Sequence, residues 1–278
     1  LNQRLYIETI LRRFEMQDCI PSPTPANPTV KLSKKLEAQP HEVDRMSTKP
    51  YRQLVGALMY TLMTRPDCAV AVNEFARFCN NPGPSMWTAV KRVLRYLKGT
   101  KSLGLRFKSK RGCKITTFVD SSHADDVDER RSRCGHTILL NGSPICWRTI
   151  LQKRKALSTA EAEYRAATYA AKDVLWLRNL LSEIDRGPRK ATVMMEDNSA
   201  CIKMIQNPIV SARNKYIELD CHFVRDHHKL GNIRIKKIAT AEQTADILTK
   251  KLPRQTFEKH RQNLLTDICR KTRRIRTA

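Results

Sequence analysis

Apolar side chains in the first hundred residues recur at the three-to-four-residue spacing of helices. Residues 1–14 predict one such helix, which the proline-rich stretch 21–29 ends. Residues 51–82 predict two helices that break before their internal proline, because a proline disfavours helical backbone in the residue that precedes it. A further helix is predicted over 85–100. The first hundred residues are therefore predicted to be mainly helical.

After Gly104 the pattern changes to short β-rich segments separated by turn residues. The order βββαβαβα predicts a mixed sheet with helices packed on its faces. A basic tail, 270–278, lacks apolar periodicity and is predicted to be disordered, with phosphate contact as a candidate role. The predicted strands span 114–120, 135–141, 144–150, 191–197 and 232–240, and the predicted helices span 159–184, 198–207 and 241–252.

The length of the chain indicates the number of domains, and its net charge indicates the kind of partner. The 278 residues suffice for two domains, and two are expected. Lysine and arginine number 52 against 27 acidic residues, and the formal net charge of +25 indicates a polyanionic partner. Nucleic acid is favoured over a membrane, because no apolar run approaches the roughly 18 residues of a spanning helix and no signal peptide opens the chain. We expect a soluble, intracellular protein. Because Leu1 lies inside a helical pattern, the chain is expected to begin within a longer reading frame.

Nine cysteines are scattered without a C-x-x-C pair, which predicts reduced, mainly structural thiols rather than a disulfide framework. One stretch offers thiol and imidazole groups together, at Cys221, His222, His227 and His228. Its spacing fits no common zinc pattern, so a mixed surface helix is favoured over a zinc site.

The predicted helix 85–100 carries four basic residues largely off its apolar face. They are either a solvated helix surface or a face that contacts phosphates, and the net charge of the chain favours the second reading. The four are Lys91, Arg92, Arg95 and Lys98.

Two glutamates stand one residue apart at the start of the long helix. Ser158 followed by Glu161 matches a capping box, in which each side chain satisfies a free backbone amide of the other residue. Glu163 lies about 200° further around the helix axis, on a face rich in alanine. It is either a solvated edge residue or a carboxylate directed at other charged groups.

Three aspartates lie where sheet-based enzymes gather site residues, at strand ends and helix starts. Asp120 ends one predicted strand, and the alternative to a site role is that it forms a turn. Asp197 ends another, and the alternative is that it caps the following helix. Asp246 lies in a helix start, and its alternative is an i,i+4 partner of Lys250. With Glu163 they suggest a cluster of four carboxylates, which suits two Mg²⁺ ions that promote phosphodiester hydrolysis.

Beyond these local patterns, the chain resembles the C-terminal part of the Pol polyprotein of copia-type retrotransposons. The resemblance covers most of residues 1–253 in the expected order. The stretches that carry it include YRQLVGALMYTLMTRPDCAVAVNEFARF, FVDSSHADD, CWRTILQKRKALSTAEAEY, MEDNSA and ATAEQTADILTK.

The resemblance implies an α/β ribonuclease H-like mixed sheet with flanking helices, preceded by a mainly helical segment from the reverse transcriptase thumb and connection. The implied boundaries are 1–107 for the reverse transcriptase remnant, 108–256 for the ribonuclease H domain and 257–278 for a basic tail. The implied activity is hydrolysis of the RNA strand of RNA/DNA hybrids, in a cytoplasmic virus-like particle or the nucleus, alongside upstream reverse transcriptase regions. The implied metal ligands, for two Mg²⁺ or Mn²⁺ ions, are Asp120, Glu163, Asp197 and Asp246.

Within this reading, Asp120 and Asp197 are expected to bridge the two metals, while Glu163 and Asp246 each hold one ion. Gln152, Asn198 and Ser199 are candidates for contact with the 2′-hydroxyls and phosphates of RNA, with helix capping as the alternative for the last two. His227 or His228 is a candidate for aiding proton transfer or product release.

The chain also departs from the family's pattern. Ser122 and His123 replace an aspartate and a tryptophan, Tyr216 and Glu218 stand where His and Asp are common, and Met86 stands where His is frequent. These changes support the alternative of a catalytically inactive transposon fragment that only binds nucleic acid. An integrase-like nuclease is a weaker alternative, because the motif order matches ribonuclease H. No Y-x-D-D stretch is present, so this chain is not expected to polymerise DNA by itself.

Overall fold

The structure is a computed structural model that describes residues 1–108, 112–207 and 219–268. The described residues form two compact units. Unit 1 comprises the described residues of Leu1–Arg106 and Lys250–Ala278, and unit 2 comprises those of Phe107–Thr249. No helix in the described part of the chain is long and apolar enough to cross a membrane.

Unit 1 is mainly helical, as the sequence predicts. The prolines act as expected, since Pro66 opens a short 3-10 turn between two helices and Pro84 opens the longest helix of the unit. A two-residue strand pair, β1 (Leu103–Gly104) with β7 (Thr266–Asp267), joins its two segments in antiparallel register. The helices are α1 (Arg4–Arg13), α2 (Val43–Ser47), α3 (Tyr51–Thr61), α4 (Ala69–Ala76), α5 (Pro84–Gly99) and α9 (Arg254–Leu264), with 3-10 turns η1 (Lys34–Leu36), η2 (Pro40–Glu42) and η3 (Pro66–Cys68).

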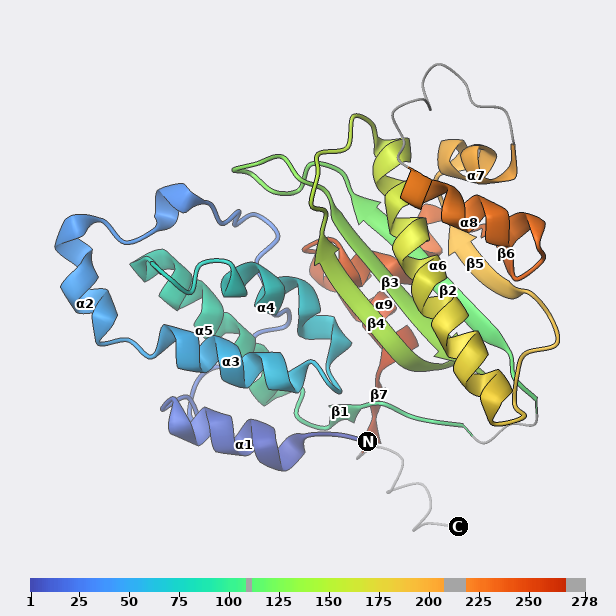
Figure 1. Cartoon of the computed structure of the whole chain (residues 1–278). Helices are drawn as coiled ribbons and strands as arrows, with labels where there is room; N and C mark the ends of the chain where they lie inside the picture. Colours follow the sequence, from blue (N-terminus) through green and yellow to red (C-terminus); the bar gives the residue numbers. More distant parts are fainter. Residues whose placement is uncertain (109–111, 208–218, 269–278) are drawn as a thin grey trace, which may run out of the picture. The chain divides into compact units, whose positions relative to one another are not determined.

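Unit 2 is built on a five-stranded mixed sheet of order β4-β3-β2-β5-β6. The first three strands along the chain pair antiparallel, whereas β2–β5 and β5–β6 pair parallel. Figure 1 shows α6 running across one face of this sheet, with α7 and α8 beside it. The strands are β2 (Ile115–Ser122), β3 (Arg133–Leu140), β4 (Ser143–Leu151), β5 (Thr192–Glu196) and β6 (Ile233–Lys237), and the helices are α6 (Thr159–Glu183), α7 (Ser199–Gln206) and α8 (Leu219–Lys229).

The core of unit 2 lies between this sheet and α6. Small side chains on α6, such as Ala167 and Ala170, are fully buried against sheet residues that include Val119, Ile138 and Met194. Alanine on the packed face lets the helix approach the sheet closely, so side chains near the helix start reach the carboxyl edge of the strands. The core therefore sets the distance between α6 and the ends of β2 and β5.

The predicted α/β mixed sheet with flanking helices is confirmed, and its strand order is consistent with the ribonuclease H-like fold that the resemblance implies. The predicted helix over 241–252 is wrong. Two 3-10 turns, η5 (Thr240–Glu242) and η6 (Thr244–Leu248), occupy it, because Gln243 is extended between them and its amide nitrogen donates to the Val119 carbonyl at 2.9 Å.

Two helices were absent from the predicted element order. Helix α8 lies in a stretch that this order leaves as a polar connection, although the mixed surface helix favoured over a zinc site there agrees with it. A basic tail was expected over 257–278. Helix α9 begins before this range and extends into it, and strand β7 lies within it. The part 270–278 lies outside the described residues. Both helices carry few apolar residues, which is why hydrophobic periodicity did not place them in the element order.

Candidate metal centre at the carboxyl ends of two parallel strands

Three of the four predicted carboxylates come together in unit 2. One oxygen each from Asp120, Glu163 and Asp197 lies within 4.8 Å of the other two. Asp120 is near the end of β2 and Asp197 directly follows β5, and these strands are parallel neighbours, so their carboxyl ends meet at one edge of the sheet. Glu163 enters from the second turn of α6. The arrangement concentrates negative charge that is mostly shielded from water, since Asp120 and Glu163 are buried.

Asp120 is held in place from a distant part of the chain. Its carboxylate accepts a hydrogen bond from the hydroxyl of Thr249, and only 1% of the residue is exposed. The Thr249 hydroxyl also lies 3.2 Å from the carbonyl oxygen of Asp246. Thr249 therefore links the β2 carboxylate to the turn η6. Sequence reasoning missed Thr249, because a threonine three residues after an aspartate carries no local signal of this contact.

Asp246 lies on η6 with 6% of its surface exposed. Among the described residues, its carboxylate does not belong to the group of three whose oxygens lie within 4.8 Å of one another. The turn that carries it packs against β2 and β3. The role of Asp246 as a ligand stays a prediction.

The two neighbouring glutamates of α6 have different surroundings. The Ser158 hydroxyl accepts from the Glu161 backbone N–H at 3.1 Å, and a Glu161 carboxylate oxygen accepts from the Leu157 N–H at 2.8 Å. The other Glu161 oxygen pairs with Arg165 at 2.6 Å. Glu161 is thus engaged at the helix start, as predicted, although the return hydrogen bond comes from Leu157 rather than from Ser158. Glu163 instead joins the carboxylate group.

A further carboxyl group, Glu196, lies beside this group and was not predicted. It ends β5, is fully buried, and accepts a hydrogen bond from the Asn198 N–H at 2.9 Å. Burial raises the pKa of Glu196 to about 8, and the charges of Asp197 and Asp120 act in the same direction. At neutral pH and without a cation this group keeps its proton. Only its position before Asp197 at the end of an apolar strand pointed to it in the sequence.

The two predicted RNA contacts after β5 have different roles in the structure. The Asn198 side-chain oxygen accepts from the N–H groups of Ala200 and Cys201 at 2.9 and 3.0 Å, which is an N-cap of α7. The exposed Ser199 accepts a hydrogen bond from the Lys237 ammonium at 2.6 Å. The capping alternative is confirmed for Asn198. RNA contact by either residue stays a prediction.

The prediction that Gln152 contacts RNA is not supported by its place in the structure. Gln152 is 1% exposed, and its amide nitrogen donates to the Ala162 carbonyl at 3.0 Å and lies 2.9 Å from the Cys134 sulfur. Its side chain ties the end of β4 to the start of α6 instead, and contact of Gln152 with RNA stays a prediction without structural support.

The basic residues predicted on α5 contact the chain itself. Arg92, Arg95 and Lys98 donate to backbone carbonyls of residues 19–24 at 2.7–3.2 Å, and Lys91 lies 5.4 Å from the centre of the Trp87 ring. The contacts of Arg92, Arg95 and Lys98 fix residues 19–24 onto α5. Contact with nucleic acid by these four residues stays a prediction.

The histidines near the end of α8 make local contacts. His227 lies 3.0 Å from the Asn232 side chain, and His228 lies 3.1 Å from the Ile233 carbonyl. Neither belongs to a group of three close metal-ligand atoms among the described residues. The Cys221 side chain, Tyr216 and Glu218 lie outside the described part of the chain.

Sequence comparison finds close relatives among transposon proteins. The chain is 40% identical over 260 residues to the retrovirus-related Pol polyprotein from transposon TNT 1-94 of Nicotiana tabacum, covering 93% of this chain and 19% of that protein. It is 34% identical over 258 residues to the corresponding polyprotein from transposon RE1 of Arabidopsis thaliana, covering 93% and 17%. The chain thus spans less than a fifth of these two polyproteins. No protein-family model matches it.

Among solved structures, the chain is similar to the N-terminal ribonuclease H domain of rv2228c from Mycobacterium tuberculosis. The two are 14% identical with a TM-score of 0.34, over 54% of this chain and 98% of that chain. The strand order of unit 2, rather than this score, defines its fold.

Proposed function

The chain belongs to the family of copia-type retrotransposon Pol polyproteins, and we propose that unit 2 is a ribonuclease H domain that hydrolyses the RNA strand of RNA/DNA hybrids. The observation that carries this proposal is the meeting of Asp120, Glu163 and Asp197 at the carboxyl edge of the sheet. The family resemblance implied each of them as a metal ligand, whereas the residues alone left another interpretation open for each.

Electrostatics supports a cation at this edge. Two unit charges 4.8 Å apart repel by about 3 kcal/mol at an effective dielectric constant of about 20. Three such pairs are costly in a partly buried site unless positive charge offsets them. The donor set consists of carboxylate oxygens, which suits hard divalent cations, and Mg²⁺ in particular, which retains several waters and takes one or two carboxylates together with substrate phosphate.

Asp120, Glu163 and Asp197 would hold these cations, and Asp246 on the adjacent turn is the candidate fourth ligand. Bound Mg²⁺ supplies the positive charge that favours attack of water on the phosphorus and departure of the 3′-oxygen. The products would be a 5′-phosphate and a 3′-hydroxyl.

The remaining side chains prepare the site. The Thr249 hydroxyl fixes the orientation of the Asp120 carboxylate. Gln243 fastens the η5–η6 segment to the sheet through the Val119 carbonyl. Glu196, while protonated, adds no further negative charge to the crowded edge. Ligands held in this way need little rearrangement when substrate phosphate arrives.

The charge of the chain supports a nucleic-acid substrate. A formal charge of +25 attracts a phosphate backbone, and the carboxylates form a local acidic spot in an otherwise basic protein. Divalent cations would let a phosphodiester approach that spot.

The substitution Asp197→Asn separates chemistry from binding. It keeps the size of the side chain but removes one negative ligand. We expect cleavage of an RNA/DNA hybrid in Mg²⁺ to be lost, while binding of the same hybrid in EDTA persists with an unchanged dependence on salt. Retained cleavage would refute the proposed site. If the folded unsubstituted chain bound hybrid and never cut it, a fragment that only binds nucleic acid would be favoured instead.

A further inference from the structure

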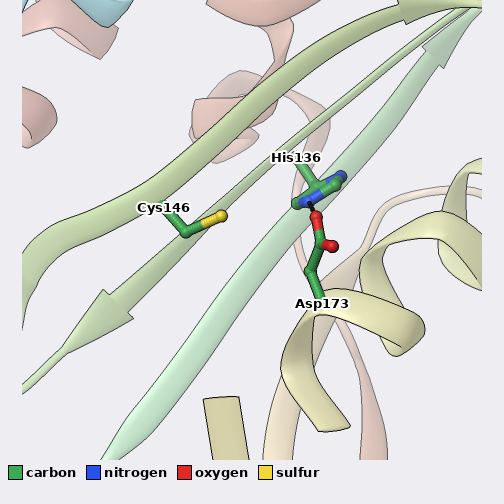
Figure 2. A group of neighbouring side chains, drawn as sticks. All are labelled: His136, Cys146 and Asp173. Carbon is green, nitrogen blue, oxygen red and sulfur yellow. Dashed lines mark hydrogen bonds and ion pairs between the residues drawn. The ribbon is translucent and has the colours of Figure 1, made fainter. Parts of the chain in front are cut away.

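Unit 2 contains a second group of metal-ligand side chains, away from the carboxylates. His136, Cys146 and Asp173 each present a ligand atom within 4.8 Å of the other two. Figure 2 shows the three side chains converging from two strands and helix α6. Their donors differ in kind, with an imidazole nitrogen, a sulfur and a carboxylate oxygen.

Sheet register explains how they meet. Cys146 pairs with Ile138 across β3 and β4, and His136 is two residues from Ile138, so Cys146 and His136 are diagonal neighbours on one face of the sheet. Asp173 reaches that face from α6. It follows Glu163 by ten residues, which places it about 15 Å further along the helix at 1.5 Å per residue. The group is therefore separate from the carboxylate site.

Contacts already hold two of these side chains together. One Asp173 oxygen lies 2.8 Å from the His136 Nε2 and 2.9 Å from the Arg148 Nε. The His136 side chain is 1% exposed, whereas those of Asp173 and Arg148 are 17% and 56% exposed. A small cation can thus reach the group from the side where Arg148 meets solvent.

We propose that His136, Cys146 and Asp173 form a binding site for Zn²⁺. Zinc is held by this kind of mixed set, with one sulfur, one nitrogen and one oxygen ligand, and its tetrahedral shell leaves a fourth position for water. Magnesium does not suit a thiolate and an imidazole, and copper(I) does not favour the carboxylate. The inference is independent of the proposed ribonuclease activity.

Binding has a defined proton balance. Burial and the Asp173 charge raise the pKa of the Cys146 thiol to about 11, so without a cation the thiol keeps its proton at neutral pH. Zn²⁺ displaces that proton to solvent and binds the lone pair of a His136 ring nitrogen, while the Arg148 guanidinium leaves Asp173. The thiol releases one proton for each ion bound, and no redox change occurs.

A bound zinc would join three elements. Strand β4 is an edge of the sheet, and the ion would tie it and β3 to α6. Because α6 also carries Glu163, the site would fix the helix about three turns from the carboxylate group. Zinc is therefore expected to raise the midpoint of thermal unfolding.

The test uses the full chain with its thiols reduced and transition metals removed. Excess Mg²⁺ is then added to occupy the carboxylate group of Asp120, Glu163 and Asp197, so that cobalt does not bind there. Cobalt(II), a spectroscopic substitute for zinc, is titrated, and the thiolate-to-cobalt charge-transfer absorbance is followed, which carboxylates cannot produce. We expect one ion per chain, displaced by Zn²⁺. Cys146→Ser should abolish the absorbance, and His136→Asn should weaken binding at least about tenfold. The matched control, Cys113→Ser, should change neither.

Arg148→Ala provides a test that misfolding cannot mimic. Removing the guanidinium frees Asp173, so cobalt should bind more tightly, by about two- to fivefold, as expected for a partly exposed ion pair. The proposal is overturned if the folded protein gives no charge-transfer absorbance, if the absorbance survives in Cys146→Ser, or if Arg148→Ala weakens binding.

Discussion

The hydroxyl of Thr249 donates a hydrogen bond to the carboxylate of Asp120, which lies 129 residues earlier in the chain. The contact joins the end of the η6 segment to the end of β2, and it orients a carboxylate that is 1% exposed. In the proposed enzyme it makes Thr249 a positioning residue for a metal ligand.

Thr249→Val should therefore weaken metal binding. Valine keeps the shape of threonine but cannot donate, and loss of a hydrogen-bond partner of a metal ligand typically costs about 10–100-fold in affinity or activity. We expect the Mg²⁺ concentration that gives half-maximal cleavage to rise. Thr249→Ser keeps the hydroxyl and should restore most of the affinity. Equal behaviour of the two variants would show that the hydroxyl has no such role.

Glutamine substitutions at Glu161 and Glu163 should have opposite consequences. Glu163→Gln removes a member of the carboxylate group, so cleavage should fall by about 10²–10³-fold with stability in EDTA unchanged or raised. Glu161→Gln loses the ion pair with Arg165 and should lower the stability slightly while cleavage persists. Paired cleavage assays and thermal unfolding check this. If only Glu161→Gln lost cleavage, Glu161 rather than Glu163 would belong to the metal site.

Glu196→Gln should stabilise the metal-free protein in a pH-dependent way. Folding raises the pKa of Glu196 from 4.5 to about 8, so below pH 4.5 both states hold the proton and the carboxyl costs nothing. Between these values the unfolded chain loses its proton and the folded protein keeps it, so stability falls as pH rises, by about 1.4 kcal/mol per unit. Glutamine does not ionise, so the stability of the variant lacks this fall with pH. Unfolding free energies in EDTA should diverge from about pH 4.5 to 8, and a gap independent of pH would contradict this.

The sequence predicted those parts of the fold and site that local patterns encode. The strands of unit 2 follow from β-rich runs between turn residues, and the positions of Asp120 and Asp197 follow from the ends of two of them. Helix geometry placed Glu163 about 200° around the axis from Glu161, but only the resemblance implied that Glu163 is a metal ligand. The capping serine already accounted for Glu161.

Features that depend on distant contacts were not predictable in this way. Thr249 and Glu196 acquire their roles from burial beside residues far away in the chain. The burial of Gln152 was not predictable because it depends on the approach of α6, whose Ala162 carbonyl accepts from its amide. The helix expected over 241–252 fails because Gln243 bonds to the sheet, a contact that no helical periodicity reveals.

Cleavage of an RNA/DNA hybrid tests the central claim most directly. The purified chain is incubated with a hybrid labelled on each strand, in Mg²⁺ or EDTA, beside Asp120→Asn and beside duplex DNA of the same sequence. We predict cuts in the RNA strand alone, only in Mg²⁺ and not with the variant, leaving 5′-phosphate ends. Metal-independent cutting, equal cutting of duplex DNA or full activity of Asp120→Asn would contradict the account.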